Sequence, residues 1–256
     1  MQILFYEEEI ISCFFVRNKY IVLKKMNMME VKNVTITDVN TEGFGIGRSE
    51  GFEKVLFVKN AINEDIVDVQ ITKTEKNFAY AEVTNVVKSS PFKAEPKCQH
   101  YGLCGGCNMQ HASYNLQLEV KQNRVKSALS KLAKVEVEVG DIIPSSKEFY
   151  YRNKMDFQFS NFCWITNEAE DKDRRALGLH IKERFDRVLN STNCHLHLPE
   201  INEIRNFIKD FCIKENAQFY NPKYKTGVMR NLIFKTNSKG EMMVIIIFAC
   251  PPKVLQ

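Results

Sequence analysis

Alternation of apolar and polar positions becomes regular only after residue 29. From there to residue 88, short β-branched runs are separated by Gly, Asn and Asp. The runs lie at residues 31–39, 55–58, 66–71 and 79–87, with a glycine-rich stretch at 43–47. Several short strands joined by tight turns are typical of a small closed barrel. We therefore expect an OB-like β-barrel over residues 29–90.

The glycine-rich stretch GFGIG at residues 43–47 is better explained by bends in barrel strands than by nucleotide binding. Its third glycine comes too early for a dinucleotide fingerprint, and no helical pattern follows. Glycine within a strand commonly marks a bend or a close approach of another backbone.

Residues 91–256 mix helical and strand patterns, which indicates an α+β domain. One helix is expected over residues 114–133, where Val125, Leu129 and Leu132 recur at helical spacing. A second helix is expected to begin at Pro199. Its apolar stripe consists of Ile201, Ile204, Ile208 and Phe211.

The same region contains several strand-like runs. They lie at residues 135–143, 150–160, 176–180, 187–189, 229–235 and 242–248. The last two runs flank the turn-forming sequence NSKG, so they are expected to form a hairpin.

Residues 1–28 precede the regular pattern and are expected to be a leader outside the fold. The alternative is a strand added to the edge of the barrel. They lack the basic start and the small-residue cleavage site of a secretory signal. No stretch reaches the roughly 18 apolar residues of a membrane span. We therefore expect a cytoplasmic protein without a membrane partner.

Charge adds little by itself. The chain has a formal net charge of +5, and the basic excess falls in residues 98–256. Such an excess is compatible with a partner that carries phosphate. On charge alone, plain solvation of the surface is the favoured explanation, so the assignment of function depends on the motifs.

Three of the eight cysteines, Cys98, Cys104 and Cys107, lie close together. In a reducing compartment, clustered thiols indicate metal ligands rather than disulfides. Iron–sulfur clusters are held by thiolates, commonly three close in sequence and one distant. Gly105 and Gly106 suit a loop around a bulky cluster because glycine permits positive φ and close backbone approach.

The fourth ligand is expected at Cys194, which lies in a polar, loop-like setting. Cys163 and Cys212 lie in apolar patterns and are expected to be small buried hydrophobes. Zinc is the main alternative occupant, with His100 or His111 completing the site. Structural zinc sites usually pair ligands two to four residues apart, whereas the first gap here is five residues. The spacing therefore favours iron–sulfur.

Four segments resemble, in order, motifs of the 23S rRNA (uracil-5-)-methyltransferases. The sequence CGGCNMQH at residues 104–111 resembles the cluster motif of that family. The later segments are YRNKMDF at 151–157, the run from 177 to 196 ending in CHL, and MRNL at 229–232. The barrel at residues 30–88 resembles the TRAM domain that precedes the cluster in many members.

The resemblance implies an enzyme that transfers a methyl group from S-adenosylmethionine to carbon 5 of a uridine in structured RNA. In this family a cysteine thiolate adds to carbon 6, and a base then removes the carbon-5 proton. A [4Fe–4S] cluster serves the fold and RNA binding. By motif position its ligands would be Cys98, Cys104, Cys107 and Cys194. TRAM domain and cluster together imply 23S rRNA rather than tRNA, and we expect a monomer.

RNA chemistry suggests further candidate residues. A base that is modified must leave its stack, and splayed bases stack on aromatic or arginine surfaces. A barrel supplies a groove with stacking residues. Candidates on the barrel are Phe44, Phe52, Lys54 and Lys59, and candidates beside the cluster are Arg152, Lys154, Arg184 and Arg230.

Family members continue into a Rossmann-like domain that binds the methyl donor and carries the nucleophile and the base. Such a domain needs roughly 100–150 further residues. Only residues 251–256 follow the last apolar run, and no glycine-rich strand-to-helix turn is found in the sequence. We therefore expect this domain to be absent, the chain to hold no catalytic residue, and the chain to be inactive alone.

Two other functions compete with this interpretation. The first is a stand-alone RNA-binding module with an iron–sulfur cluster or zinc and no methyltransferase activity. The second is a radical methylthiotransferase with a TRAM domain. That class of enzyme has a C-x3-C-x2-C motif ahead of its TRAM domain. Here the cysteines are separated by five and two residues, and the barrel precedes them. The second is therefore disfavoured.

Overall fold

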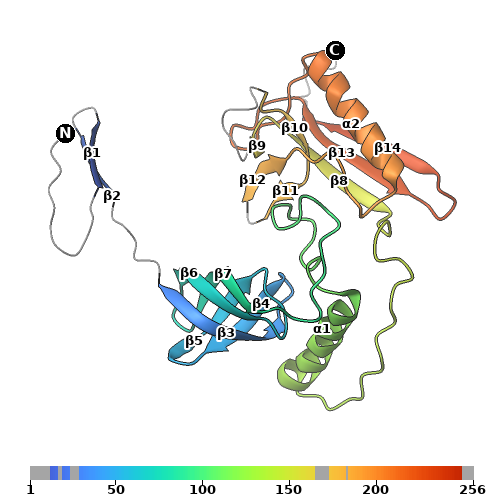
Figure 1. Cartoon of the computed structure of the whole chain (residues 1–256). Coiled ribbons are helices and arrows are strands. Elements are labelled where there is room, and N and C mark those ends of the chain that lie inside the picture. The colour runs from blue at the N-terminus through green and yellow to red at the C-terminus, as the bar shows by residue number, and fades with distance from the viewer. Residues whose placement is uncertain (1–11, 17–18, 24–28, 165–172, 183, 250–256) are drawn as a thin grey trace. The chain divides into compact units, whose positions relative to one another are not determined.

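The computed structural model describes residues 12–16, 19–23, 29–164, 173–182 and 184–249 (Figure 1). The chain divides into two compact units. The first consists of residues 1–38 and 44–90, and the second of residues 39–43 and 91–256.

In the first unit, five strands close into a barrel in the order β3-β4-β5-β7-β6. They are β3 (Glu30–Val39), β4 (Phe44–Ser49), β5 (Phe52–Lys59), β6 (Ile66–Thr74) and β7 (Phe78–Lys88). Strands β5 and β7 pair in parallel. The pairs β3–β6, β4–β5 and β6–β7 are antiparallel. The predicted small closed barrel is therefore confirmed.

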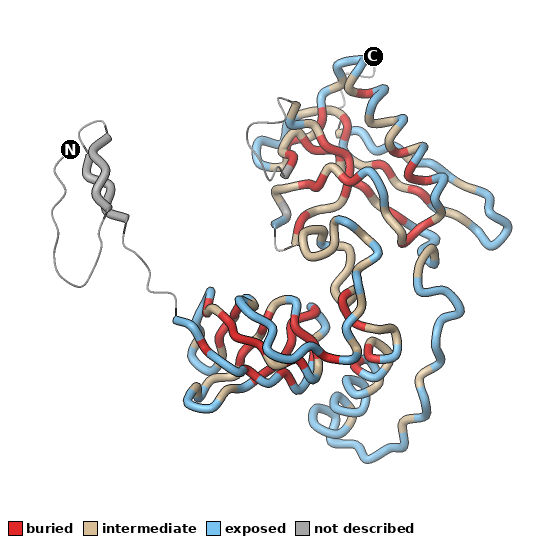
Figure 2. Tube along the Cα trace, viewed as in Figure 1, coloured by how far each residue is buried: buried red, intermediate tan, exposed pale blue. Residues whose placement is uncertain are grey.

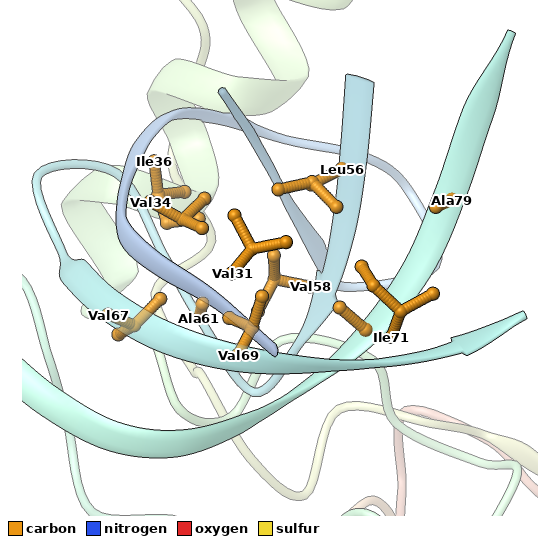
Figure 3. Packing of buried hydrophobic residues seen from close by; sticks show 11 residues of the cluster. Val31, Val34, Ile36, Leu56, Val58, Ala61, Val67, Val69, Ile71 and Ala79 are labelled. Atoms are coloured by element: carbon orange, nitrogen blue, oxygen red, sulfur yellow. The ribbon is translucent and has the colours of Figure 1, made fainter. Parts of the chain in front are cut away.

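Alternate residues of these strands fill the barrel interior (Figure 3). Val34, Leu56, Val58, Val67 and Val69 are fully buried. Burying each such side chain contributes about 1.5–3 kcal/mol relative to leaving it exposed. The period-two pattern of the sequence thus has a direct physical cause, since one face of each strand lines a closed apolar core.

Two glycines of β4 are required by close packing. A Cβ at Gly45 would lie 2.7 Å from the carbonyl oxygen of Ala61, and one at Gly47 would lie 2.8 Å from that of Thr35. Both distances are too short for a carbon atom. Close approach within the barrel therefore explains the glycine-rich stretch, as the sequence suggested.

Strands β1 (Ser12–Val16) and β2 (Lys19–Leu23) form a separate two-stranded antiparallel sheet. They pair with each other, and in the described part of the chain neither is a member of the barrel sheet. The assignment of residues 1–28 as a leader stays a prediction, and residues 1–11, 17–18 and 24–28 lie outside the described residues.

The described residues of the second unit form two sheets together with the helices α1 and α2, so this unit is α+β as expected. One sheet has the order β10-β8-β13-β14 and the other the order β11-β12-β9. The strands are β8 (Lys154–Ser160), β9 (Cys163–Trp164), β10 (Ala176–Gly178), β11 (His180–Ile181), β12 (Arg184–Leu189), β13 (Met229–Thr236) and β14 (Met242–Phe248). Strands β13 and β14 form the predicted antiparallel hairpin.

Helix α2 (Pro199–Lys214) supplies one side of the core of this unit. Ile201 shares an apolar cluster with Phe157, Leu232 and Phe234 of the four-stranded sheet. Figure 2 shows this buried layer between α2 and the central strands. Phe211, the last residue of the expected apolar stripe, is 54% exposed, and the buried face of α2 continues through Cys212 instead.

Three expectations for residues 114–160 need correction. The predicted helix is present as α1 (Tyr114–Ser127), which continues into a π-helical turn, η1 (Ala128–Ala133). Its expected apolar stripe does not face a core, because Val125 is 50% exposed and Leu132 is 83% exposed. Leu116 and Val120 are buried instead.

The predicted strand at residues 135–143 is wrong, since these residues pair with no strand. Among the described residues, no sheet edge pairs with this alternating apolar segment. The strand predicted for residues 150–160 begins later, at Lys154, because residues 150–152 hydrogen-bond to a loop instead. None of the helices that the structure describes has the length and apolar character to cross a bilayer.

Candidate metal centre and nucleic-acid interface

The loop that carries Cys98, Cys104 and Cys107 is wound tightly on itself. The Tyr101 amide donates to the carbonyl of Cys98 (3.0 Å), and the Cys104 amide donates to that of His100 (2.9 Å). The amide of Gly106 points at the Cys104 sulfur, 3.4 Å away. Backbone amides directed at sulfur are a feature that the sequence led us to expect of this loop.

Strand β11 anchors the loop to the rest of the unit. The Gly105 amide donates to the carbonyl of His180 (2.9 Å), and the Lys182 amide donates to that of Leu103 (2.9 Å). Cys104 and Ile181 form an isolated antiparallel bridge. Three of the candidate ligands are therefore carried by a loop with a fixed attachment.

Cys194 is held from helix α2. The Asn202 side chain, which is 8% exposed, accepts from the Cys194 amide (2.9 Å) and donates to the Cys194 carbonyl (3.1 Å). Asn202 also donates to the Asn193 side chain (2.9 Å). These contacts fix the backbone of the fourth candidate ligand against the first turn of the helix.

All four cysteines line one pocket, although Cys194 is far from the others in sequence. Within the described residues, no three His, Cys, Asp or Glu side chains converge tightly enough to hold a single metal ion. A zinc ion needs sulfur atoms about 2.3 Å from one point. The four thiols share one pocket but are not set at this spacing.

The pocket disfavours free thiolates. Burial raises the pKa of the Cys104 thiol to about 11, and it also raises the pKa values of Cys107 and Cys194. These thiols are protonated at neutral pH unless a cation binds and displaces the proton. They are therefore poor nucleophiles but suitable ligands.

The two histidines of the zinc alternative are placed differently. His100 lines the pocket, and burial lowers the pKa of its ring. His111 is buried, and its Nδ1 is bonded to the hydroxyl of Tyr101. Of these two histidines, His100 is therefore the one positioned to add a ligand to the four cysteines.

Arg205 of α2 is the largest fully buried side chain in the protein's described part. Its charge interacts with Cys194 and Cys104, while burial lowers its pKa to about 10. It thus stays protonated at neutral pH beside the cysteine pocket. A buried positive charge is expected where a negatively charged group binds.

Basic and aromatic side chains lie next to Cys194. The amides of Tyr150 and Arg152 donate to the carbonyls of His195 and Leu196, both at 2.8 Å. The Lys97 ammonium lies 4.8 Å from the centre of the Tyr150 ring. Arg152 is exposed, and its charge acts on Cys107.

The other predicted RNA contacts of this unit are exposed but less clearly grouped. Lys154 begins β8 beside Arg152. Arg184 forms an ion pair with Asp186 (Nε to Oδ1, 2.8 Å), which occupies its guanidinium. The Arg230 guanidinium lies 5.3 Å from the ring centre of Tyr220. Arg152 and Lys154 are therefore the better candidates beside the pocket.

The barrel candidates require revision. Phe44 is only 7% exposed and meets Tyr80 edge-on, so little of its ring is open to a base. Phe52 packs against the apolar core of the barrel. Lys54 donates to the Glu75 carbonyl, and Lys59 pairs with Glu82.

Three half-buried aromatics, Phe57, Phe78 and Tyr80, form a cluster that the sequence reasoning missed. They come from the parallel pair β5 and β7, where Phe57 lies opposite Tyr80. A signal was present in the sequence, because Phe78 and Tyr80 alternate with the buried Ala79 and Ala81 and must share the outer face.

Comparison with known proteins identifies the domain family of the barrel and relatives of the chain. The TRAM domain family matches residues 28–84, so the barrel is a TRAM domain. A protein of Bacteroides thetaiotaomicron named an uncharacterized RNA methyltransferase is 40% identical over 75% of this chain and 44% of its own length. One of Porphyromonas gingivalis with the same name is 38% identical over 83% of this chain and 48% of its own.

A solved structure has a similar fold. It is the tRNA (uracil-54, C5)-methyltransferase of Pyrococcus abyssi in complex with S-adenosyl-L-homocysteine. It is 24% identical, with a TM-score of 0.58 over 84% of this chain and 46% of that chain. At this identity the likeness concerns the fold.

The chain is thus a TRAM-domain protein related to RNA methyltransferases. The relatives are named RNA methyltransferases, which is consistent with the resemblance to the RNA (uracil-C5-)-methyltransferase family. The chain spans about half the length of the curated relatives that it matches. The comparisons do not support the expectations of an absent Rossmann-like domain and of an inactive chain.

Proposed function

We propose that these residues provide the RNA-binding and cluster-bearing part of an S-adenosylmethionine-dependent RNA (uracil-C5-)-methyltransferase that acts on 23S rRNA in the cytoplasm as a monomer. The proposal rests on one observation: a single pocket, next to exposed basic and aromatic side chains, is lined by Cys98, Cys104, Cys107 and Cys194. Residues 29–90 would be the TRAM domain and residues 91–256 the cluster-bearing domain.

The donor set of the pocket fits a [4Fe–4S] cluster. Four cysteines match its usual ligand set, and the buried cation Arg205 suits its negative charge. When bound, the cluster would link the loop at residues 98–107 to the segment around Cys194. The protein side of that link is supplied by Asn202 and strand β11.

The residues of this chain would hold and orient the RNA. Arg152 and Lys154 would contact phosphates, since exposed basic side chains without fixed partners suit the RNA backbone. Tyr150, Tyr151 and Phe149 lie beside them, and Tyr151 is 54% exposed. Exposed aromatic rings stack on bases that have left a helix. The aromatic cluster of the barrel, Phe57, Phe78 and Tyr80, would offer a second stacking surface.

The choice of 23S rRNA is tested against tRNA, because the similar solved structure belongs to a tRNA enzyme. Anaerobically purified protein is titrated with transcripts of 23S rRNA domains and with unmodified tRNA, each at two salt concentrations. We expect one rRNA transcript to bind about tenfold more tightly than tRNA at both concentrations. Preferential binding of tRNA would overturn the choice of substrate but keep the enzyme class.

The competing function is a stand-alone RNA-binding module. It shares the cysteine pocket and the basic surface, so binding alone does not separate the two. Relatives named as RNA methyltransferases favour the enzyme. Transfer of label from S-adenosylmethionine to 5-methyluridine, measured with the gene product as the cell makes it, decides between them.

A further inference from the structure

Arg205 is a positive charge sealed inside the molecule. Its side chain is 0% exposed, and none of its three guanidinium nitrogens has a hydrogen-bond partner among the described residues. The guanidinium lies 4.7 Å from the centre of the Phe157 ring, which attracts it but is no substitute for strong acceptors. A buried cation without an anion is strongly unfavourable, so its presence calls for a missing partner.

The position of Arg205 indicates where that partner binds. Asn202 holds Cys194 from one turn earlier on α2, and residues three apart lie on the same face of a helix. The charge of Arg205 acts on Cys194 and Cys104, which are far apart in the sequence and line the same pocket.

We propose that Arg205 is the buried counter-cation of the group bound by the four cysteines, and that its N–H groups donate to the sulfurs of Cys104 and Cys194. The proposal rests on the proposed cluster. Four thiolates around an iron–sulfur core leave a net negative charge, and hydrogen bonds and charges near the sulfurs set its potential. Arg205 would supply both.

If Arg205 has this role, its replacement by an apolar side chain should have opposite effects on the stability of the cluster-free and the cluster-loaded protein. Without the cluster, Arg205 is an uncompensated buried charge, and its replacement by an apolar side chain of similar size is expected to stabilise the fold. With the cluster, the same replacement removes a favourable interaction. If Arg205 only supported the fold, its replacement would change the stability of both forms in the same direction.

The test uses Arg205→Met, Arg205→Lys and the control Lys214→Met, which removes an exposed charge from the same helix. Thermal unfolding is followed for anaerobically purified, cluster-loaded protein and for protein freed of iron by chelation. We expect Arg205→Met to melt later than wild type without the cluster and earlier with it. Arg205→Lys should lie close to wild type, and the control should change neither form.

The reduction potential of the cluster gives a second readout. Reduction adds negative charge, so loss of a neighbouring cation disfavours it. At a fixed potential the ratio of reduced to oxidised cluster should fall about tenfold in Arg205→Met, which is about 59 mV for a one-electron couple. Arg205→Lys should restore most of the difference. Wild-type potential in Arg205→Met, or failure of this variant to fold in both forms, would overturn the role of Arg205.

The proposed cluster and the proposed role of Arg205 can be contradicted by different results. Wild-type protein without iron and sulfide would overturn the cluster itself. Wild-type protein with a cluster, together with an Arg205→Met variant of unchanged potential and unchanged melting, would overturn only the assignment of Arg205.

Discussion

The side chain of Asn202 holds the backbone of Cys194 through two hydrogen bonds, one accepted from its amide (2.9 Å) and one donated to its carbonyl (3.1 Å). The two residues lie on either side of the start of helix α2. This contact joins the core of the second unit to the candidate metal centre, because the neighbouring Ile201 packs in that core.

Asn202→Ala is therefore expected to weaken cluster binding without unfolding the domain. Buried hydrogen bonds of this kind cost about 1–3 kcal/mol when one partner is lost. Partners that orient a metal ligand typically change affinity about 10–100-fold. The rate of iron release to a chelator measures the effect. Asn206→Ala is the matched control, since Asn206 is on the same helix and bonds to the Thr192 carbonyl instead. Equal rates in both variants would contradict the role of Asn202.

Charge reversal at Arg152 and Lys154 together is expected to weaken RNA binding about tenfold at moderate salt. The dependence of affinity on salt should also become shallower, by about one unit of slope for each lost phosphate contact. Reversal at Lys214 and Lys239, which are exposed at the end of α2 and in the β13–β14 turn, serves as the control. Binding measured by fluorescence anisotropy should show a clear difference, and equal losses would argue against this surface.

The barrel contains a carboxylate whose contribution depends on pH. Asp68 accepts from the Asn33 amide (3.0 Å) and from the Asn85 side chain (3.1 Å), and these bonds lower its pKa. A lowered folded-state pKa gives stability that is complete above the ordinary value of 3.8 and is lost as pH falls through the lowered value.

Asp68→Asn is therefore expected to melt several degrees below wild type at pH 7, and the difference should shrink as the pH falls below about 4. Thermal unfolding of the barrel followed by circular dichroism checks this. Glu53→Gln, an exposed change on β5, should show no such trend. A difference that grows at acidic pH would show that the sign is wrong.

The buried thiols of the second unit are predicted not to act as the nucleophile of carbon-5 methylation. That reaction needs an activated thiolate, which requires a lowered pKa. Burial raises the pKa of Cys104, Cys107, Cys194 and Cys212. Cys212→Ala is therefore expected to leave unchanged the transfer of label from S-adenosylmethionine to 5-methyluridine, measured with the gene product as the cell makes it. Loss of that label in Cys212→Ala would contradict the prediction.

The sequence predicted the elements whose own residues build a core. Parts of the barrel strands alternate because one face is enclosed, and this period correctly predicts that Val34 and Val58 are buried. The prediction of secondary structure or burial failed where regularly spaced apolar residues have no neighbouring element to pack against. Leu132 fits a helical stripe but is exposed, and residues 135–143 alternate without pairing to a strand.

The candidate centre was predicted in part. The close spacing of Cys98, Cys104 and Cys107 indicated ligands, and the polar setting of Cys194 suggested the fourth. Arg205 could not be recognised, because a lone arginine within a helical pattern is ordinarily an exposed residue. Only its complete burial beside the cysteines identifies it.

Iron and acid-labile sulfide in anaerobically purified protein test the central claim most directly. We predict about four irons and four sulfides per chain in the wild type, as a cubane requires. Cys194→Ser should lose the cluster, while Cys212→Ser should keep it, because Cys212 lies in the apolar core. Stoichiometric zinc without iron or sulfide, or a cluster that survives in Cys194→Ser, would contradict the claim.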